Sequence, residues 1–135
     1  MTKVAVVAHA GKSFGGGLPE LRRELERRGI PDPMWVEVPK SKFAPKQVRR
    51  ALADGAKLLF VWGGDGMVQR SIDALAGSET PLAILPAGTA NLLATNLGIP
   101  QDIRRAVAIG LDGERRKLDV GRFNGERFAV MAGAG

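Results

Sequence analysis

The sequence predicts an α/β protein built on a doubly wound, mostly parallel β-sheet. Short apolar runs alternate with helical periodicity four times along the chain, and glycine-rich turns follow three of those runs. One run is apolar on both faces, as expected for a strand in a sheet that helices cover on both sides. With 135 residues, of which 44% are hydrophobic, the chain fits one domain with a substantial core.

The first two strand-helix units follow directly from the N-terminus. A β-branched run at 4–7 enters a glycine-rich loop at 11–17, and leucines then recur at helical spacing over 18–25. The second unit repeats this order, with a strand at 35–38 and a helix at 45–52 that has proline in its first turn. Both helices end before a glycine, which is a typical stop signal.

The third and fourth units carry the clearest signals. Residues 57–62 predict a strand buried on both faces, followed by the turn 63–66 and a helix over 68–76. A fourth strand at 82–85 leads into the turn 86–91. The carboxyl ends of these strands should lie at one edge of the sheet, where open α/β proteins bind ligands.

The pattern changes in the last quarter of the chain. Helical segments near 92–97 and 103–111 are followed by two apolar runs, 115–120 and 127–131. Asn124-Gly125 between these runs predicts a β-hairpin. The alternation of strand and helix therefore ends with a late hairpin.

Composition excludes several kinds of chemistry. The chain has no cysteine, so disulfides and thiolate metal sites are ruled out, and with no export signal at its start a cytoplasmic protein is expected. His9 is the only histidine, which leaves almost no material for a zinc site or a Ser-His-Asp triad.

The net charge of +6 indicates attraction to anions. The arginines of 22–28 share one expected helix with glutamates, and Glu24 and Arg28 have the spacing of an ion pair. No aromatic residues interleave these arginines, so a solvated helix face is favoured over a nucleic-acid interface.

The turn Gly63-Gly64-Asp65-Gly66 is the strongest candidate for ligand binding. Glycines let backbone N–H groups approach a phosphate closely, and the following helix contributes its positive end. A carboxylate beside an anionic ligand is costly unless a cation lies between them, so Asp65 indicates magnesium. The alternative is that Asp65 only caps the helix that begins near Gly66.

Two further turns could serve the same ligand. Gly88, Thr89 and Asn91 offer backbone donors, a hydroxyl and an amide, although the turn could simply be capped by Thr89. Gly11 and Lys12 belong to a loop that departs from the Walker pattern and does not match the dinucleotide fingerprint. A flexible loop is the alternative there.

Taken in order, four motifs resemble the catalytic domain of diacylglycerol kinases. They are Gly63-Gly64-Asp65-Gly66, Leu85-Pro86-Ala87-Gly88-Thr89-Ala90-Asn91, Leu97-Gly98-Ile99-Pro100 and Leu118-Asp119-Val120-Gly121. Each motif is weak alone, but the ordered set spans nearly the whole chain and is specific.

The resemblance implies a fold shared with NAD kinases and phosphofructokinases, in which residues 1–135 form the nucleotide-binding domain. It implies a C-terminal β-sandwich domain, absent from this chain, that supplies the catalytic base, and transfer of the γ-phosphate of Mg-ATP to a lipid alcohol such as diacylglycerol or a sphingoid base. We therefore expect this chain alone to fold but not to turn over. The residues implied at the site are Gly11, Lys12, Gly63, Gly64, Asp65, Gly66, Gly88, Thr89 and Asn91 for ATP, with Asp65 catalytic and both Asp65 and Asp119 on magnesium.

The chain departs from the family pattern at several positions. Threonine usually stands where Met67 is, and an acid usually stands where Leu92 is. A non-catalytic nucleotide-binding module therefore stays open as an alternative. An NAD kinase-like enzyme is the nearest rival, although NAD kinases carry a different loop in place of 86–91. Transient contact with the inner membrane surface is consistent with a lipid kinase, and the late apolar strands leave a homo-oligomer open.

Overall fold

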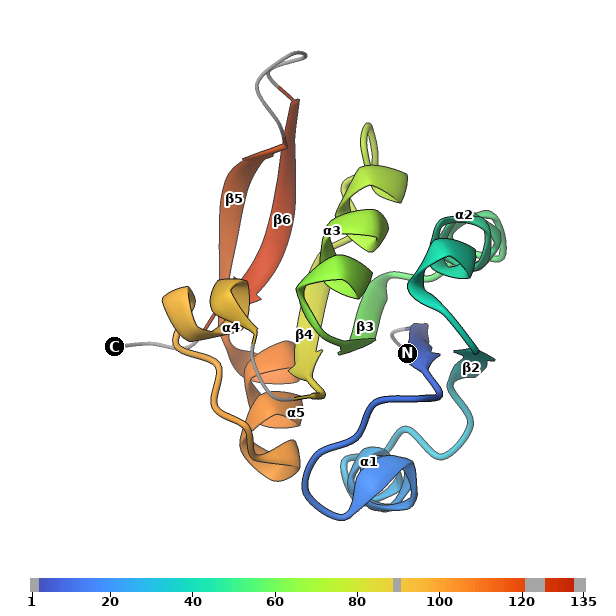
Figure 1. The fold of residues 1–135 in the computed structure, drawn as a ribbon, viewed down its shortest axis with the longest axis vertical. Helices are drawn as coiled ribbons and strands as arrows, with labels where there is room; N and C mark the ends of the chain where they lie inside the picture. Colours follow the sequence, from blue (N-terminus) through green and yellow to red (C-terminus); the bar gives the residue numbers. More distant parts are fainter. Residues whose placement is uncertain (1–2, 89–90, 121–125, 133–135) are drawn as a thin grey trace.

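The computed structural model describes residues 3–88, 91–120 and 126–132, and the side chains of 117–120, 126–129 and 132 lie outside this description. The elements alternate in the order expected, and Figure 1 shows their arrangement. In chain order they are β1 (Val4–His9), α1 (Gly17–Arg27), β2 (Met34–Val38), the 3-10 helix η1 (Ser41–Phe43), α2 (Ala44–Ala53), β3 (Leu58–Gly63), α3 (Asp65–Ala74), β4 (Leu82–Pro86), α4 (Leu92–Asn96), α5 (Ile103–Asp112), β5 (Glu114–Val120) and β6 (Glu126–Ala132).

One mixed sheet with the strand order β2-β1-β3-β4-β6-β5 organises the protein. β1 is parallel to both β2 and β3, β3 is parallel to β4, and only β5 runs antiparallel to its neighbour. In the sheet, β2 lies on one side of β1 and β3 lies on its other side. The strand order therefore reverses at β1 and β3, which is where open α/β sheets bind ligands.

Helices cover both faces of the sheet, which confirms the doubly wound fold. α1 packs with α5, whereas α2 packs with α3, and the two pairs lie on opposite sides of the central strands (Figure 1). All six residues of β3 are buried, as the apolar run predicted. Trp62 is fully buried, and its ring centroid lies 4.7 Å from that of Phe14 in the first loop.

The predicted hairpin is confirmed by the antiparallel register of β5 and β6, while its turn lies outside the described residues. β6 continues the parallel sheet beside β4, with Val130 opposite Leu82. The last two strands thus belong to the same sheet as the strand-helix units.

The expected ion pair between Glu24 and Arg28 is wrong. Glu24 pairs instead with Arg27, the residue before Arg28, at 2.6 Å between Oε2 and Nη2, and Arg28 reaches Asp112 at the end of α5. The hydrogen bond from Arg27 lowers the pKa of the buried Glu24 carboxyl. Its contribution to stability is therefore complete above the ordinary value of 4.5 and is lost as the pH falls through the lower folded-state pKa.

Candidate functional site

A cleft of about 250 Å³ lies at the carboxyl edge of the sheet, where β1, β3 and β4 end. It collects residues from three loops and from η1, which are far apart in the sequence. The lining residues are His9, Lys12, Ser41, Gly64, Asp65, Gly66, Met67, Ala87 and Gly88. Five of the residues expected from the sequence therefore meet here, and the strand order reverses beside them.

The first loop is fixed to the core at several points. The backbone N–H of Gly11 donates to Nδ1 of His9 at 3.0 Å, and the indole N–H of Trp62 donates to the carbonyl of Lys12 at 2.9 Å. Gly88 donates its N–H to the carbonyl of Ser13 at 3.1 Å. These bonds argue against a freely flexible loop and hold Lys12 at the cleft.

Gly63 has a structural role that the phosphate-binding expectation did not include. A Cβ at this position would lie 2.6 Å from Cβ of Met67, so only glycine lets α3 start so close to β3. Gly63 is not among the residues that line the cleft, unlike the three residues that follow it. The N-terminus of α3, beginning at Asp65, faces the cleft with N–H groups that precede the first helical hydrogen bond.

Asp65 does not cap its own helix. The N-cap of α3 is Gly64, with no side-chain hydrogen bond, and the Asp65 carboxylate crosses to α4 instead. Its Oδ2 accepts from the N–H of Leu92 at 3.1 Å, and its Oδ1 accepts from Leu93 at 3.3 Å. Asp65 thus joins the second and third loops and stays exposed at the cleft.

Asn91 also connects the second and third loops, in this case from the third loop back to the second. It is the N-cap of α4 and accepts from the N–H of Ala94 at 2.9 Å, while its side-chain amide donates to the carbonyl of Gly63 at 3.1 Å. The N-cap of α4 is therefore Asn91, and Thr89, the expected cap, lies outside the described residues. Asn91 is 6% exposed and borders a neighbouring cavity beside α4, so its position indicates a positioning role.

We expect Asn91→Ala to lower the free energy of unfolding by about 2 kcal/mol, because it removes a cap and one of the two N–H donors to the Gly63 carbonyl, the other being the backbone N–H of Ala87. Chemical denaturation measures this loss. Asp102→Ala is the matched control, since Asp102 makes an equivalent cap to Arg105 but no second bond, and should cost about 1 kcal/mol. Equal losses in the two variants would contradict the bridging role.

Two residues that the sequence interpretation missed support these loops. Gln101 donates from its side-chain amide to the carbonyls of Pro86 and Gly88, at 3.2 and 2.8 Å. Trp62 supports the first loop through its indole N–H. The signal for Trp62 was present, because a tryptophan in a fully apolar strand needs a partner for its N–H. Gln101 had no such signal, since its partners lie 13 and 15 residues away.

Not all expected site residues come together. Thr89 lies outside the described residues. Asp119 pairs with Arg127 in the hairpin, and Val130 of the same strand pairs with Leu82 at the start of β4. Asp119 therefore lies beyond the amino end of β4, whereas Asp65 lies near its carboxyl end. The register does not bring the two aspartates together.

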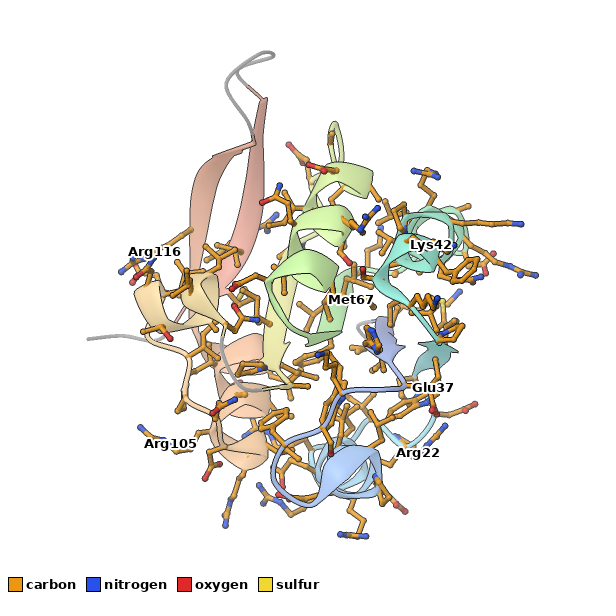
Figure 2. The ribbon with its side chains drawn as sticks, viewed as in Figure 1. Arg22, Glu37, Lys42, Met67, Arg105 and Arg116 are labelled. Carbon is orange, nitrogen blue, oxygen red and sulfur yellow. The ribbon has the colours of Figure 1, made fainter. Side chains whose placement is uncertain are left out.

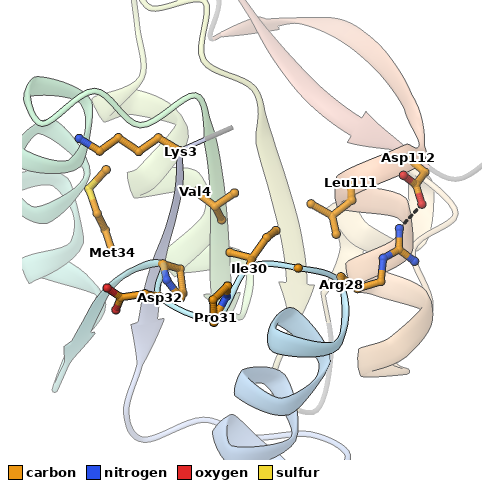
Figure 3. Close-up of a pocket in the computed structure, with 11 residues that line it drawn as sticks. Lys3, Val4, Arg28, Ile30, Pro31, Asp32, Met34, Leu111 and Asp112 are labelled. Carbon is orange, nitrogen blue, oxygen red and sulfur yellow. Dashed lines mark hydrogen bonds and ion pairs between the residues drawn. The ribbon is translucent and has the colours of Figure 1, made fainter. Parts of the chain in front are cut away.

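A larger cavity of about 490 Å³ opens at the opposite edge of the sheet, between the amino end of β1 and the ends of α1 and α5. Figure 3 shows its charged side chains: Arg28 points to Asp112, with which it forms an ion pair. Lys3 donates to the backbone carbonyl of Asp54 at 2.7 Å. These cations are engaged already, and the cavity lies away from the carboxyl edge, so it is the weaker candidate.

The fold and the cleft define a doubly wound α/β domain whose ligand site lies among glycine-rich loops at the carboxyl edge of the sheet. Residues 4–123 match the family described as the diacylglycerol kinase catalytic domain. The chain belongs to this family. The match favours the diacylglycerol kinase resemblance over that to NAD kinases.

Individual relatives agree with the family match. A diacylglycerol kinase of Mycobacterium tuberculosis is 37% identical over 117 residues, which cover 82% of this chain and 38% of that protein. A YegS-like lipid kinase of Pseudomonas aeruginosa is 44% identical over 94 residues, covering 68% of this chain and 31% of that protein. The crystal structure of a diacylglycerol kinase from Bacillus anthracis superposes with a TM-score of 0.75 at 27% identity, covering 93% of this chain and 44% of the other.

This chain therefore spans less than half the length of these relatives.

Proposed function

We propose that this chain is the ATP-binding part of a lipid kinase, which transfers the γ-phosphate of Mg-ATP to a hydroxyl group of a lipid such as diacylglycerol. The observation that carries the proposal is the cleft, in which Lys12, the turn at 64–66 and Gly88 face one another at the point where the strand order reverses. Phosphoryl transfer depends mainly on positioning and on neutralising charge, and these residues are suited to both tasks.

The phosphates of ATP would be bound by backbone N–H groups and one cation. The N-terminus of α3 offers N–H groups and a positive helix end. Lys12 adds a positive charge from the opposite loop, and its Cδ lies 3.5 Å from where a Cβ of Gly88 would be. Gly88 has a φ of +113°, a conformation that other residues rarely adopt, so the narrow approach of these two loops depends on glycine.

Magnesium fits the donor set through Asp65. Its two oxygens accept two N–H bonds, and a carboxylate has about four acceptor sites, so it can still bind a cation or its water shell. Among the described residues no group of three or more acidic, histidine or cysteine side chains forms a metal cage. Magnesium often uses one or two carboxylates together with substrate phosphates and water. When bound, it would neutralise the charge on the phosphates.

The acceptor side is proposed to lie outside these residues. The relatives are two to three times as long as this chain, which leaves room for the β-sandwich domain and the base that the family resemblance implies. Aligning the lipid hydroxyl with the phosphate accounts for a large part of the rate of such a reaction. Residues 1–135 alone should therefore bind Mg-ATP without producing phospholipid.

Isothermal titration of residues 1–135 with ATP and ADP, with and without magnesium, tests the proposal. We expect ATP to bind, and magnesium to strengthen the binding. Incubation with Mg-ATP and mixed lipid alcohols should give no product above background. Failure to bind either nucleotide would contradict the proposal and favour an inert scaffold, and turnover at about 1 per second or more would place the whole active site within these residues.

A further inference from the structure

One segment of the chain accounts for most of its net positive charge. Residues 39–53 contain five lysines and arginines and no acid, whereas the other 15 basic residues are almost balanced by 14 acidic ones. This segment alone therefore accounts for five of the six net charges. The five basic residues are Lys40, Lys42, Lys46, Arg49 and Arg50.

The fold presents these cations on one corner of the molecule, formed by η1 and α2. All five are exposed, while Val48 and Ala51 on the inner side of α2 belong to the core. Lys46 and Arg50 are four residues apart in the helix and so share a face. Figure 2 labels Lys42 at this corner, where nitrogen-tipped side chains extend away from the sheet. We call residues 40–50 the basic corner.

The basic corner differs from the arginine-rich helix α1. In α1 the arginines alternate with glutamates, and both ion pairs found in the described part of the chain use an arginine from this region. Neither ion pair involves the basic corner. The nearest acids in the sequence are Glu37, which accepts from the indole N–H of Trp35, and Asp54 at the end of α2. Within residues 39–53 all the charges are therefore positive.

An exposed aromatic ring lies among these cations. Phe43 is 46% exposed, and Nζ of Lys42 lies 5.3 Å from the centre of its ring. In the described residues only Phe43 and Leu92 are large apolar side chains with such exposure. Apolar anchors surrounded by lysine and arginine are typical of surfaces that lie in the headgroup region of a bilayer. An ordinary solvated helix face needs no such anchor.

The basic corner adjoins the candidate site. Ser41, between Lys40 and Lys42, lines the cleft together with Asp65. Its Oγ lies 4.0 Å from where a Cβ of Gly66 would be. Any external surface that binds the basic corner would therefore lie next to the proposed phosphate site. No helix in the described ranges is long and apolar enough to cross a bilayer.

We propose that the basic corner docks this protein on an anionic lipid membrane, with Phe43 inserted between headgroups and the cations on lipid phosphates. Only the purpose of this docking rests on the proposed lipid kinase function. Docking would hold the cleft at the membrane surface that contains the lipid alcohol. The positive charge of the basic corner and the exposed ring of Phe43 support the proposal independently of nucleotide binding. Each lysine or arginine near an anionic membrane contributes about 1 kcal/mol, equivalent to about fivefold in affinity.

Co-sedimentation with vesicles tests the proposal. One set contains equal parts phosphatidylglycerol and phosphatidylcholine, and the other contains phosphatidylcholine alone. The wild type should bind the anionic vesicles and not the neutral ones. The triple variant Lys42→Gln, Lys46→Gln and Arg50→Gln should bind about a hundredfold more weakly. Phe43→Ala should lose about tenfold at unchanged net charge, because it removes the inserted ring.

The matched control removes the same number of charges elsewhere, through Arg23→Gln, Lys57→Gln and Arg104→Gln. It should retain nearly wild-type vesicle binding, and circular dichroism should show all variants folded. Equal losses in the two triple variants, or equal binding to both kinds of vesicle, would overturn the proposal. Tighter binding of the wild type to duplex DNA than to anionic vesicles would do so as well.

ATP titration of the same variants separates this proposal from the proposed function. Loss of vesicle binding with unchanged ATP affinity is the expected result. A wild type that fails to bind ATP but binds vesicles through the basic corner would overturn the kinase proposal and leave the membrane surface intact.

Discussion

Asp65→Ala is expected to weaken ATP binding in the presence of magnesium by about a hundredfold, which corresponds to the loss of one charge-assisted contact of about 2–3 kcal/mol. The overall fold should persist, because Asp65 is an exposed residue of the first turn of α3 rather than a core residue. Titration of wild type and variant with Mg-ATP measures the effect. Equal affinities would argue against a metal role for Asp65.

The bonds from Asp65 to α4 make a second comparison necessary. Asp65→Asn removes the negative charge but keeps a carbonyl oxygen that can accept from Leu92 or Leu93. If Asp65 acts through magnesium, both variants should bind ATP about equally well when magnesium is absent. A large loss in Asp65→Ala alone under those conditions would show that Asp65 acts mainly by holding α4.

Asp119→Asn completes this test. Two carboxylates on one cation should give losses that are not additive in the double variant. The strand register, which keeps Asp119 away from Asp65, favours a small and additive effect. Strong coupling between the two substitutions would show that the hairpin reaches the cleft in the nucleotide complex.

Gly110→Ala is expected to lower the free energy of unfolding by about 3 kcal/mol, at the upper end of the usual cost of overpacking a core. A Cβ at this position of α5 would lie 2.4 Å from Cε1 of Phe60 and 3.0 Å from Cβ of Ala83. Both neighbours are buried strand residues, so the helix or the strands would have to move. The better helix propensity of alanine, about 1 kcal/mol, is too small to compensate for this overlap.

A double-variant cycle separates overlap from other effects. Phe60→Leu alone should be destabilising, but it makes room for the added methyl group. The combination Gly110→Ala with Phe60→Leu should therefore be less destabilised than the sum of the single variants, by about 1 kcal/mol or more. Additive losses in urea denaturation would show that the close approach of α5 to the sheet does not determine the cost.

The sequence contained most of the information about the fold. Periodicity is a local property, so the four strand-helix units, the buried run at 58–62 and the late hairpin could be predicted from it. Parallel strands covered by helices also require that the glycine-rich turns lie at one edge. This is why Lys12, the turn at 64–66 and Gly88 could be expected in one cleft.

Individual side-chain partners could not be predicted in this way. Asp65 was expected to face magnesium or to cap its own helix, yet it bonds to a helix that starts 27 residues later. Arg28 was assigned to Glu24 by helical spacing, but the packing of α1 against α5 brings Asp112 closer. Spacing predicts which residues share a helix face, whereas the partner across a face depends on how two elements pack.

The tertiary structure also decided which glycines are there for steric reasons. Gly63 was expected only as part of the phosphate-binding turn and Gly110 only as part of the helix at 103–111, but each allows a close approach, to α3 and to Phe60 respectively. The sequence by itself determined the order of the elements and the edge that holds the site, because both follow from local pattern and chain connectivity. The distances between elements depend on how the whole core packs. Those distances determined the hydrogen bonds that Asp65 and Asn91 make to other loops.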